Sequence, residues 1–167
     1  MTLNSFSLYI FGGTGDLSNR KLLPAMFRQE ILSTFDEESE IVGIGSKEIS
    51  SDEYICMVKE SLSNYFHGFD DHADSWALFS KRLRYIKLDI NSEDDWINFQ
   101  KLPEERSVIL YLATPPFLYK TISNNLKSYN LVNKNCRVVV EKPLGTNLET
   151  SNDINDSLAQ GFQEHQI

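Results

Sequence analysis

Five short apolar runs alternate along this chain with longer segments of helical periodicity. Each run is rich in Val, Ile, Leu, Tyr or Phe and ends within a few residues of glycine, proline or an acid. Strands that alternate with helices are joined by right-handed crossovers and form a parallel sheet covered on both faces. We therefore predict a doubly wound, Rossmann-like α/β fold with strand order of about 3-2-1-4-5. The predicted strands are residues 5–11, 40–45, 83–90, 107–113 and 136–141.

The segments between these runs have apolar residues three or four positions apart, as helices do. In the first of them, Ser18 is a possible cap and Pro24 lies early, where its missing N–H costs least. Pro115 and Pro116 end the fourth strand, because neither can donate to a sheet ladder. The predicted helices are residues 18–32, 50–66, 74–82, 93–102, 117–129 and 147–163.

The composition narrows the class of protein. The chain has 167 residues, of which 41% are hydrophobic and 24% charged, as is typical of one globular domain. It has no apolar stretch of membrane-spanning length and no signal-peptide pattern, so we expect a cytoplasmic protein without a membrane partner. The net charge of −8 also opposes binding to nucleic acid. We expect a single domain over residues 1–167.

The cysteines and histidines lack the spacing of metal ligands, and we expect no metal site. Cys56 and Cys136 are far apart and lie inside periodic segments, so we expect two buried thiols rather than a disulfide. We expect His67, His72 and His165 to be surface residues.

The glycine-rich turn after the first strand predicts a phosphate site. Gly12, Gly13, Thr14 and Gly15 lie where a doubly wound sheet binds its ligand, beyond the carboxyl end of the first strand. Glycine lacks a β-carbon, so the main chain can take positive φ and approach an anion closely. The next helix presents unpaired N–H groups and the positive end of its dipole. Because these donors are main-chain groups, the acidic net charge does not oppose binding of a diphosphate.

The strict dinucleotide fingerprint G-x-G-x-x-G fails at its third position, which is Ser18. The turn nevertheless follows a clear strand and opens a clear helix, which favours nucleotide binding over an ordinary glycine turn. Asp16 and Leu17 continue the turn. We expect the Asp16 carboxylate to bond local N–H groups rather than a ligand.

The residues after the second strand bear on the choice of cofactor. An NAD site usually has an acid there for the ribose 2′-hydroxyl, whereas an NADP site has small or basic groups. Ser46 and Lys47 favour a 2′-phosphate, although Glu48 weakens the case, and an ordinary surface turn is the alternative. Asp89, with Ile90 beside it, could meet the adenine, but Asp89 could equally cap a helix.

The turn "EKPLG", residues 141–145, follows the fifth strand and reaches the same edge as the glycine turn. A lysine fixed by the following proline can hydrogen-bond a substrate hydroxyl and stabilise developing negative charge. Lys142 is therefore a candidate catalytic residue, with a solvated turn as the alternative.

Three stretches together resemble the glucose-6-phosphate dehydrogenase family: "FGGTGDLSNRKLLPAMF", "LATPPFLY" and "RVVVEKPLGTNLETSNDIN", in matching order over nearly the whole chain. The resemblance implies the N-terminal cofactor-binding domain of an enzyme that oxidises glucose 6-phosphate at C1 to 6-phosphogluconolactone. In that family the hydride passes to NADP⁺, as the first step of the oxidative pentose phosphate pathway. The resemblance further implies that residues 12–20 form the phosphate loop and that Tyr119 and residues 113–116 lie along the cofactor. Lys142 would contact sugar and nicotinamide, and Pro143 would help to position the two.

Two departures limit what the resemblance implies. Ser46 stands where the family usually has an arginine for the 2′-phosphate. The family's general-base histidine, most of its sugar-phosphate ligands and its oligomer contacts belong to a second domain, which would begin after Ile167. We therefore expect the chain alone to be inactive. Two alternatives stay open: a truncated, non-catalytic NADP(H)-binding module, and the nucleotide domain of another sugar oxidoreductase.

Overall fold

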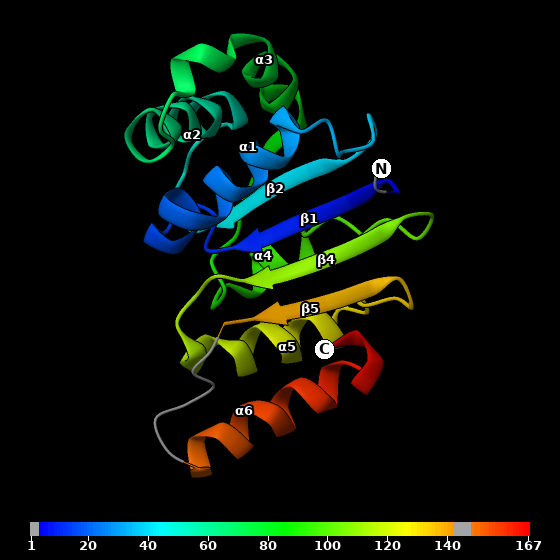
Figure 1. Cartoon of the computed structure of the whole chain (residues 1–167). Helices are drawn as coiled ribbons and strands as arrows, with labels where there is room; N and C mark the ends of the chain where they lie inside the picture. The colour runs from blue at the N-terminus through cyan, green and yellow to red at the C-terminus, as the bar shows by residue number, and fades with distance from the viewer. Residues whose placement is uncertain (1–3, 142–147) are drawn as a thin grey trace.

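A single parallel sheet forms the centre of the computed structural model, which describes residues 4–141 and 148–167. Its strands lie in the order β3-β2-β1-β4-β5, which confirms the predicted doubly wound α/β fold (Figure 1). The strand bounds are β1 Phe6–Phe11, β2 Glu40–Gly45, β3 Leu83–Lys87, β4 Ser107–Leu112 and β5 Cys136–Val140.

Helices pack on both faces of the sheet (Figure 1). One face carries α1 Leu23–Ile31, α2 Ser51–Tyr65 and α3 Ala73–Arg82. The other face carries α4 Glu93–Ile97, α5 Tyr119–Ser128 and α6 Leu148–Gly161. Short 3₁₀ turns span Phe69–His72, Pro116–Leu118 and Glu164–Gln166. Among the helices of the described ranges, none has the length and hydropathy needed to cross a membrane.

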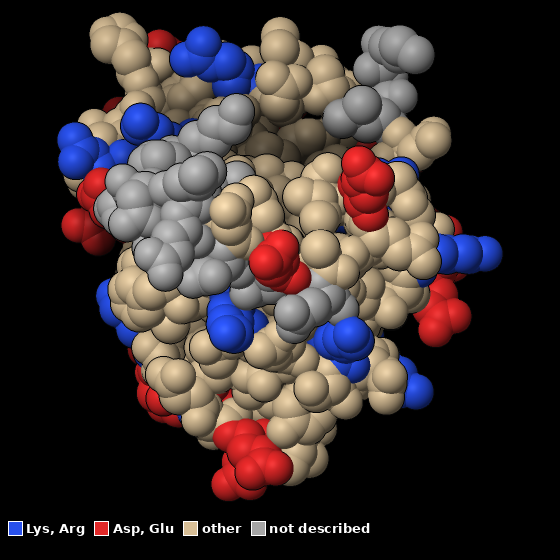
Figure 2. Space-filling view, turned by 90° about the horizontal axis from the view of Figure 1, so that it is seen from below, with Lys and Arg blue, Asp and Glu red and all other residues tan. Residues whose placement is uncertain are grey.

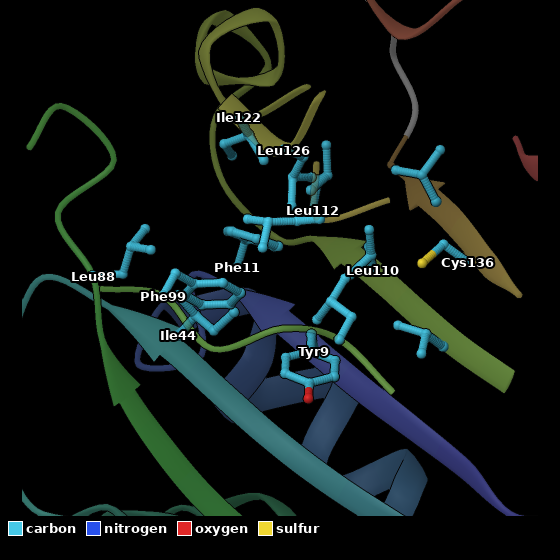
Figure 3. Close-up of a cluster of buried hydrophobic side chains, with 14 of the residues drawn as sticks. Tyr9, Phe11, Ile44, Leu88, Phe99, Leu110, Leu112, Ile122, Leu126 and Cys136 are labelled. Carbon is cyan, nitrogen blue, oxygen red and sulfur yellow. The ribbon is translucent and has the colours of Figure 1, made fainter. Parts of the chain in front are cut away.

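The central strand β1 is buried along its whole length, as its continuous apolar run predicts. Phe6, Leu8 and Ile10 pack against the helices α1 to α3, whereas Tyr9 and Phe11 face the helices α4 to α6. This alternation is the two-residue period of a strand. Figure 3 shows the apolar cluster on the side of α4 to α6, which combines Tyr9 and Phe11 with side chains from β2, β4, β5 and α5.

Helix α2 begins with a capping box that fixes its first turn. The N–H of Glu53 donates to Ser50 Oγ at 3.2 Å, and the N–H of Ser50 donates to the Glu53 carboxylate at 2.7 Å. These bonds satisfy two main-chain donors that the helix itself leaves free, and they lower the pKa of Glu53. The cap matters for the site because Tyr54 is the next residue along the helix.

The segment after the glycine turn differs from the prediction in its first turns. Helical structure already begins at Asp16 and passes through a π-helical turn, Ser18–Leu22, before α1 starts. Ser18 is therefore not a helix cap: its buried hydroxyl donates to the Gly12 carbonyl at 2.8 Å. Pro24 lies in the first two residues of α1, as expected.

The prediction of two buried thiols was half wrong. Cys136 is buried on β5, and burial raises its pKa. Cys56 is exposed, because it lies on the outer side of α2 while Tyr54 and Val58 point into the core. Both are free thiols.

The histidines follow the prediction in two of three positions. His67 and His165 are exposed. His72 is half-buried, since its ring packs edge-on against Phe27 and Phe66 with centroids 6.4 and 6.2 Å away. Among the described residues, no group of three or more His, Cys, Asp or Glu side chains could hold a metal ion. On the face in Figure 2, the visible acidic and basic side chains are interspersed.

Candidate functional site

A cleft of about 320 Å³ opens beyond the carboxyl ends of β1 to β4. The strands of the sheet point toward the same edge (Figure 1), which is where doubly wound sheets bind ligands. Four segments line the cleft: Phe11, Gly12, Thr14 and Gly15; Ile44, Gly45 and Ser46; Leu88, Asp89, Ile90 and Asn91; and Ala113, Thr114, Pro115 and Leu118.

The glycine turn uses its own N–H groups to hold the strand ends together. The N–H groups of Gly12 and Gly13 both donate to the Ile44 carbonyl at 2.9 Å. The N–H of Gly15 donates to the Gly12 carbonyl at 2.9 Å. These three donors are therefore engaged within the protein and are not the free donors of an anion site.

The glycines are required by close approach between neighbouring chain segments. A β-carbon on Gly13 would lie 2.6 Å from the Gly43 Cα atom, on β2. A β-carbon on Gly12 would lie 2.7 Å from the Ala113 carbonyl oxygen, and Gly12 also has a φ of +86°. A larger residue at either position would push β1 away from β2 or from the turn that follows β4.

The donors left for an anion come from the start of the helix. The first N–H groups of a helix have no intrahelical acceptor, and here these belong to Asp16, Leu17 and Ser18, since the N–H of Asn19 donates to the Gly15 carbonyl at 3.0 Å. The expected hydrogen bonds from local N–H groups to the Asp16 carboxylate are not among the contacts that the structure describes. This exposed carboxylate instead pairs with Arg20 at 3.6 Å, and among the described contacts it has no hydrogen bond. An exposed pair of this kind contributes little to stability, but it leaves the helix donors free.

The end of β2 carries the residues expected to select the cofactor. Ser46 lines the cleft, whereas Lys47 does not, and both are exposed. The Lys47 carbonyl accepts the Tyr85 hydroxyl at 3.0 Å and the N–H of Ile49 at 3.1 Å. Glu48 is exposed and is not part of the lining that the structure describes.

Asp89 lines the cleft and does not cap a helix. Its carboxylate accepts the N–H of Asn91 at 2.9 Å, within its own turn. Ser92 caps α4 instead, because its hydroxyl accepts the N–H of Asp95 at 3.2 Å. Of the two readings of Asp89, the structure thus rules out the cap.

A charged contact holds the main chain of the segment after β3, which includes Asp89, in place. The Asp95 carboxylate accepts the N–H of Asp89 at 2.6 Å and the Lys87 ammonium at 2.7 Å. Hydrogen bonds from Lys87 and from the Asp89 N–H lower the pKa of Asp95. The adjacent Ile90, which also lines the cleft, is held through its carbonyl by the Trp96 indole at 2.9 Å.

The turn after β4 contains a polar atom that the sequence did not single out. Thr114 lines the cleft, and its Oγ1 is buried with no hydrogen-bond partner in the described part of the chain. Leaving a buried hydroxyl unpaired costs about 1–3 kcal/mol. Such an atom favours a site that a polar ligand completes. Nothing in "ATPP" alone distinguishes this threonine from an ordinary turn residue.

Two tyrosines hold the end of β5. The Glu141 carboxylate accepts the Tyr111 hydroxyl, and this contact and, above all, burial raise the pKa of Tyr111. Tyr119 does not line the cleft: it is fully buried, its hydroxyl donates to the Leu112 carbonyl at 3.3 Å, and it takes a backbone hydrogen bond from Glu141. The predicted catalytic residue Lys142 lies outside the described residues.

The predicted cofactor residues therefore divide into two groups. Those that line the cleft are Gly12, Thr14, Gly15, Ser46, Asp89 and Ile90. Those that the structure describes elsewhere are Gly13, Asp16, Leu17, Lys47 and Tyr119. Pro143 lies, like Lys142, in the segment that is not described.

Sequence reasoning missed a pair of buried aromatic residues below the cleft. The rings of Tyr54 and Tyr85 are 5.3 Å apart. The Tyr54 hydroxyl donates to the Gly13 carbonyl at 3.3 Å, while Tyr85 donates to Lys47 as described above. Gly43 was the available signal, because a β-carbon there would lie 2.4 Å from the Tyr54 ring.

Comparison with known proteins shows which family this chain matches. Residues 9–167 match the family described as "Glucose-6-phosphate dehydrogenase, NAD binding domain". The chain is 35% identical over 165 residues to glucose-6-phosphate 1-dehydrogenase of Rhizobium meliloti, covering 97% of this chain and 34% of that protein. It is 37% identical to the Dickeya dadantii protein of the same name, covering 99% and 34%. The chain thus spans about a third of the length of these relatives.

Solved structures give the same result for the fold. The chain superimposes on glucose-6-phosphate 1-dehydrogenase from Mycobacterium avium with a TM-score of 0.88 and 30% identity, covering 98% of this chain and 35% of that one. It also resembles a glucose-6-phosphate dehydrogenase solved in complex with glucose 6-phosphate, with a TM-score of 0.81 and 26% identity, covering 99% and 37%.

Proposed function

Because the chain belongs to the glucose-6-phosphate dehydrogenase family, we propose that it is the cofactor-binding part of an enzyme that oxidises glucose 6-phosphate to 6-phosphogluconolactone with NADP⁺. The observation that carries this proposal is the cleft at the strand ends, lined by the glycine turn. We propose that residues 1–167 are the NADP-binding domain. The substrate-binding and oligomerisation domain is then contributed by sequence beyond this chain.

The lining of the cleft suits a dinucleotide. Gly12, Thr14 and Gly15 bring unhindered main chain to its floor, and the start of the helix adds N–H donors for a diphosphate. Ser46 and Asp89 also line the cleft, and we propose that Ser46 lies near the ribose 2′ position and Asp89 near the adenine. Under this proposal each part of the ligand meets its own segment of the cleft.

Two features of the protein support a bound group at this place. The glycine turn forms a cradle that side chains at Gly12 or Gly13 would disrupt. The buried Thr114 hydroxyl has no partner among the described residues, so a polar atom of a ligand would satisfy it. When bound there, NADP⁺ supplies the acceptor for the hydride.

The reaction requires a residue that orients the sugar hydroxyl and a base that removes its proton, and this chain supplies only the first. By its position in "EKPLG", we propose that Lys142 hydrogen-bonds the C1 hydroxyl of the sugar and orients it. A histidine of the second domain would remove the proton from that hydroxyl. The present chain then binds and orients, and it does not complete the reaction alone.

The test is a calorimetric titration of the purified chain with NADPH and with NADH, together with an assay of glucose 6-phosphate oxidation. We expect about tenfold tighter binding of NADPH, equivalent to about 1.4 kcal/mol, and negligible turnover. Failure to bind either dinucleotide would contradict the cofactor site. Near-normal turnover by the chain alone would contradict the division of labour between two domains.

A further inference from the structure

We propose that Tyr85 is a positioning residue that sets the preference for a 2′-phosphate, by holding the turn that follows β2 through the Lys47 carbonyl. This inference rests on the proposed function, since it concerns the NADP preference of the same cleft.

Tyr85 is placed to act on the turn without touching the ligand. It comes from β3, is 8% exposed, and does not line the cleft. Its hydroxyl donates to the Lys47 carbonyl at 3.0 Å. A β-carbon on Gly45 would lie 3.1 Å from the same hydroxyl, so this glycine gives the phenol its room.

The turn itself carries opposite charges on consecutive residues. Lys47 is a cation and Glu48 an anion, and both are exposed directly after the cleft-lining Ser46. The main-chain conformation at Lys47 therefore decides which charge lies nearer to the 2′ position. A 2′-phosphate is strongly anionic and responds to this choice, whereas the neutral 2′-hydroxyl of NAD(H) does not.

Few other contacts fix this conformation. The Lys47 carbonyl also accepts the N–H of Ile49 at 3.1 Å, a bond within the turn, and the Gly45 carbonyl accepts the N–H of Leu88 at 2.8 Å before the turn begins. Among the described contacts, the bond from the Tyr85 hydroxyl is the side-chain hydrogen bond that connects the Lys47 main chain to the sheet. Its loss would release the turn while the sheet stays intact.

The neighbouring Tyr54 provides an internal control of the same chemistry. Its ring lies 5.3 Å from that of Tyr85, it is fully buried, and its hydroxyl donates to the Gly13 carbonyl at 3.3 Å. The glycine turn serves the diphosphate, which NADPH and NADH share. Removing this second hydroxyl should therefore affect both ligands alike.

The experiment compares Tyr85→Phe with Tyr54→Phe by calorimetric titration with NADPH and NADH. Phenylalanine keeps each buried ring, and melting curves check that both variants fold. Loss of one hydrogen bond should weaken NADPH binding to Tyr85→Phe about fivefold and leave NADH within about twofold. Tyr54→Phe should weaken both ligands by the same factor. Adding Tyr85→Phe to Lys47→Ala should give no further loss of preference, because both changes act through one turn.

A rescue variant separates positioning from general damage. Glu48→Gln removes the competing anion, so it should restore most of the NADPH preference to Tyr85→Phe. Equal weakening of both ligands by Tyr85→Phe, or no weakening, overturns the role of Tyr85. If the unaltered chain prefers NADPH and Tyr85→Phe keeps that preference, only this inference fails. If the unaltered chain shows no preference, the proposed cofactor choice fails and the inference fails with it.

Discussion

The cleft has two walls that are built by different means. The main-chain wall, residues 11–15 and 43–46, is held by backbone hydrogen bonds such as those from Gly12 and Gly13 to the Ile44 carbonyl at 2.9 Å, and the Ser18 and Tyr54 hydroxyls add bonds to the carbonyls of this turn. The side-chain wall comprises the segments 87–95 and 111–119 with Glu141, of which residues 88–91, 113–115 and 118 line the cleft. Carboxylates and hydroxyls hold these segments, in addition to the backbone bonds from Leu88 to Gly45 and from Ala113 to Phe11. The side-chain contacts are Lys87 with Asp95, Tyr111 with Glu141, and Tyr119 with the Leu112 carbonyl.

This difference predicts how each wall tolerates change. Main-chain atoms cannot move aside without shifting a strand, so an added atom in the main-chain wall should cost much stability at any pH. A contact between side chains can be lost while the backbone stays in place, and its strength depends on ionisation. The main-chain wall should therefore be intolerant of substitution, and the side-chain wall sensitive to pH.

The largest effect is expected for Gly13→Ala in the main-chain wall. The new β-carbon would lie 2.6 Å from Gly43 Cα and 2.9 Å from Ile44 N, both of them backbone atoms. We expect a loss of about 3 kcal/mol in the free energy of unfolding, at the upper end for overpacking, together with loss of dinucleotide binding. Denaturant unfolding and NADPH titration measure the two effects.

Gly15→Ala is the matched control within the same turn. Among the described residues, the nearest atom to its β-carbon would be the Gly12 carbonyl oxygen, at 3.1 Å, so a small shift relieves the contact. We expect a loss of about 1 kcal/mol. If Gly13→Ala were as stable as Gly15→Ala, close packing of main chain would not be what fixes this wall.

The main-chain wall was also the part of the site that the sequence predicted best. Apolar runs, glycines and helical periodicity are local signals, and they located β1, the turn at Gly12 to Gly15, and the strand order. The glycine pattern arises because strand ends approach one another, which any chain with this fold must achieve. The pattern did not reveal that the N–H groups of Gly12, Gly13 and Gly15 donate hydrogen bonds to carbonyls within the protein.

Side-chain contacts were predicted poorly, for a physical reason. Tyr54 and Tyr85 belong to a helix and a strand far apart in sequence, and only the folded chain brings their rings together. Tyr119 is expected along the cofactor from the family resemblance, and its burial in the core was not indicated by the sequence pattern. Asp16 was expected to bond the turn, yet its carboxylate extends to Arg20. Hydroxyl and carboxylate partners depend on tertiary distance, which periodicity does not encode.

An intermediate effect is expected for Tyr111→Phe in the side-chain wall. The variant loses the hydrogen bond to Glu141 but keeps the ring, so we expect a loss of about 1 kcal/mol in the free energy of unfolding near neutral pH, since solvent screens this half-buried pair. Comparison of unfolding curves for the variant and the unaltered chain measures this loss.

The pH dependence of this difference identifies its origin. Burial and Glu141 raise the pKa of Tyr111 above the value of about 10 in an unfolded chain. The contribution of the neutral phenol is therefore fully present below about pH 10 and is lost as the pH rises through the raised pKa. The gap between the two proteins should close at alkaline pH. A gap that stays constant would mean that the phenol–carboxylate contact does not stabilise the wall.

The smallest effect is expected for Asp95→Asn, which removes the charge that faces Lys87 at the exposed end of the same wall. Hydrogen bonds donated by the Lys87 ammonium and by the Asp89 N–H lower the pKa of Asp95, and the bond that Lys87 donates to Asp95 raises the pKa of Lys87. The carboxylate's contribution is therefore present above the unfolded value of about pH 4 and is lost as the pH falls through the lowered pKa. The lysine's contribution is present below about pH 10 and is lost above it. Melting temperatures of the two proteins should thus differ slightly at neutral pH and converge in acid.

The same variant should bind NADPH almost as well as the unaltered chain, because asparagine can still accept the Asp89 N–H. A large loss of NADPH binding would mean that the charge of Asp95, and not its support of the main chain, holds the segment around Asp89.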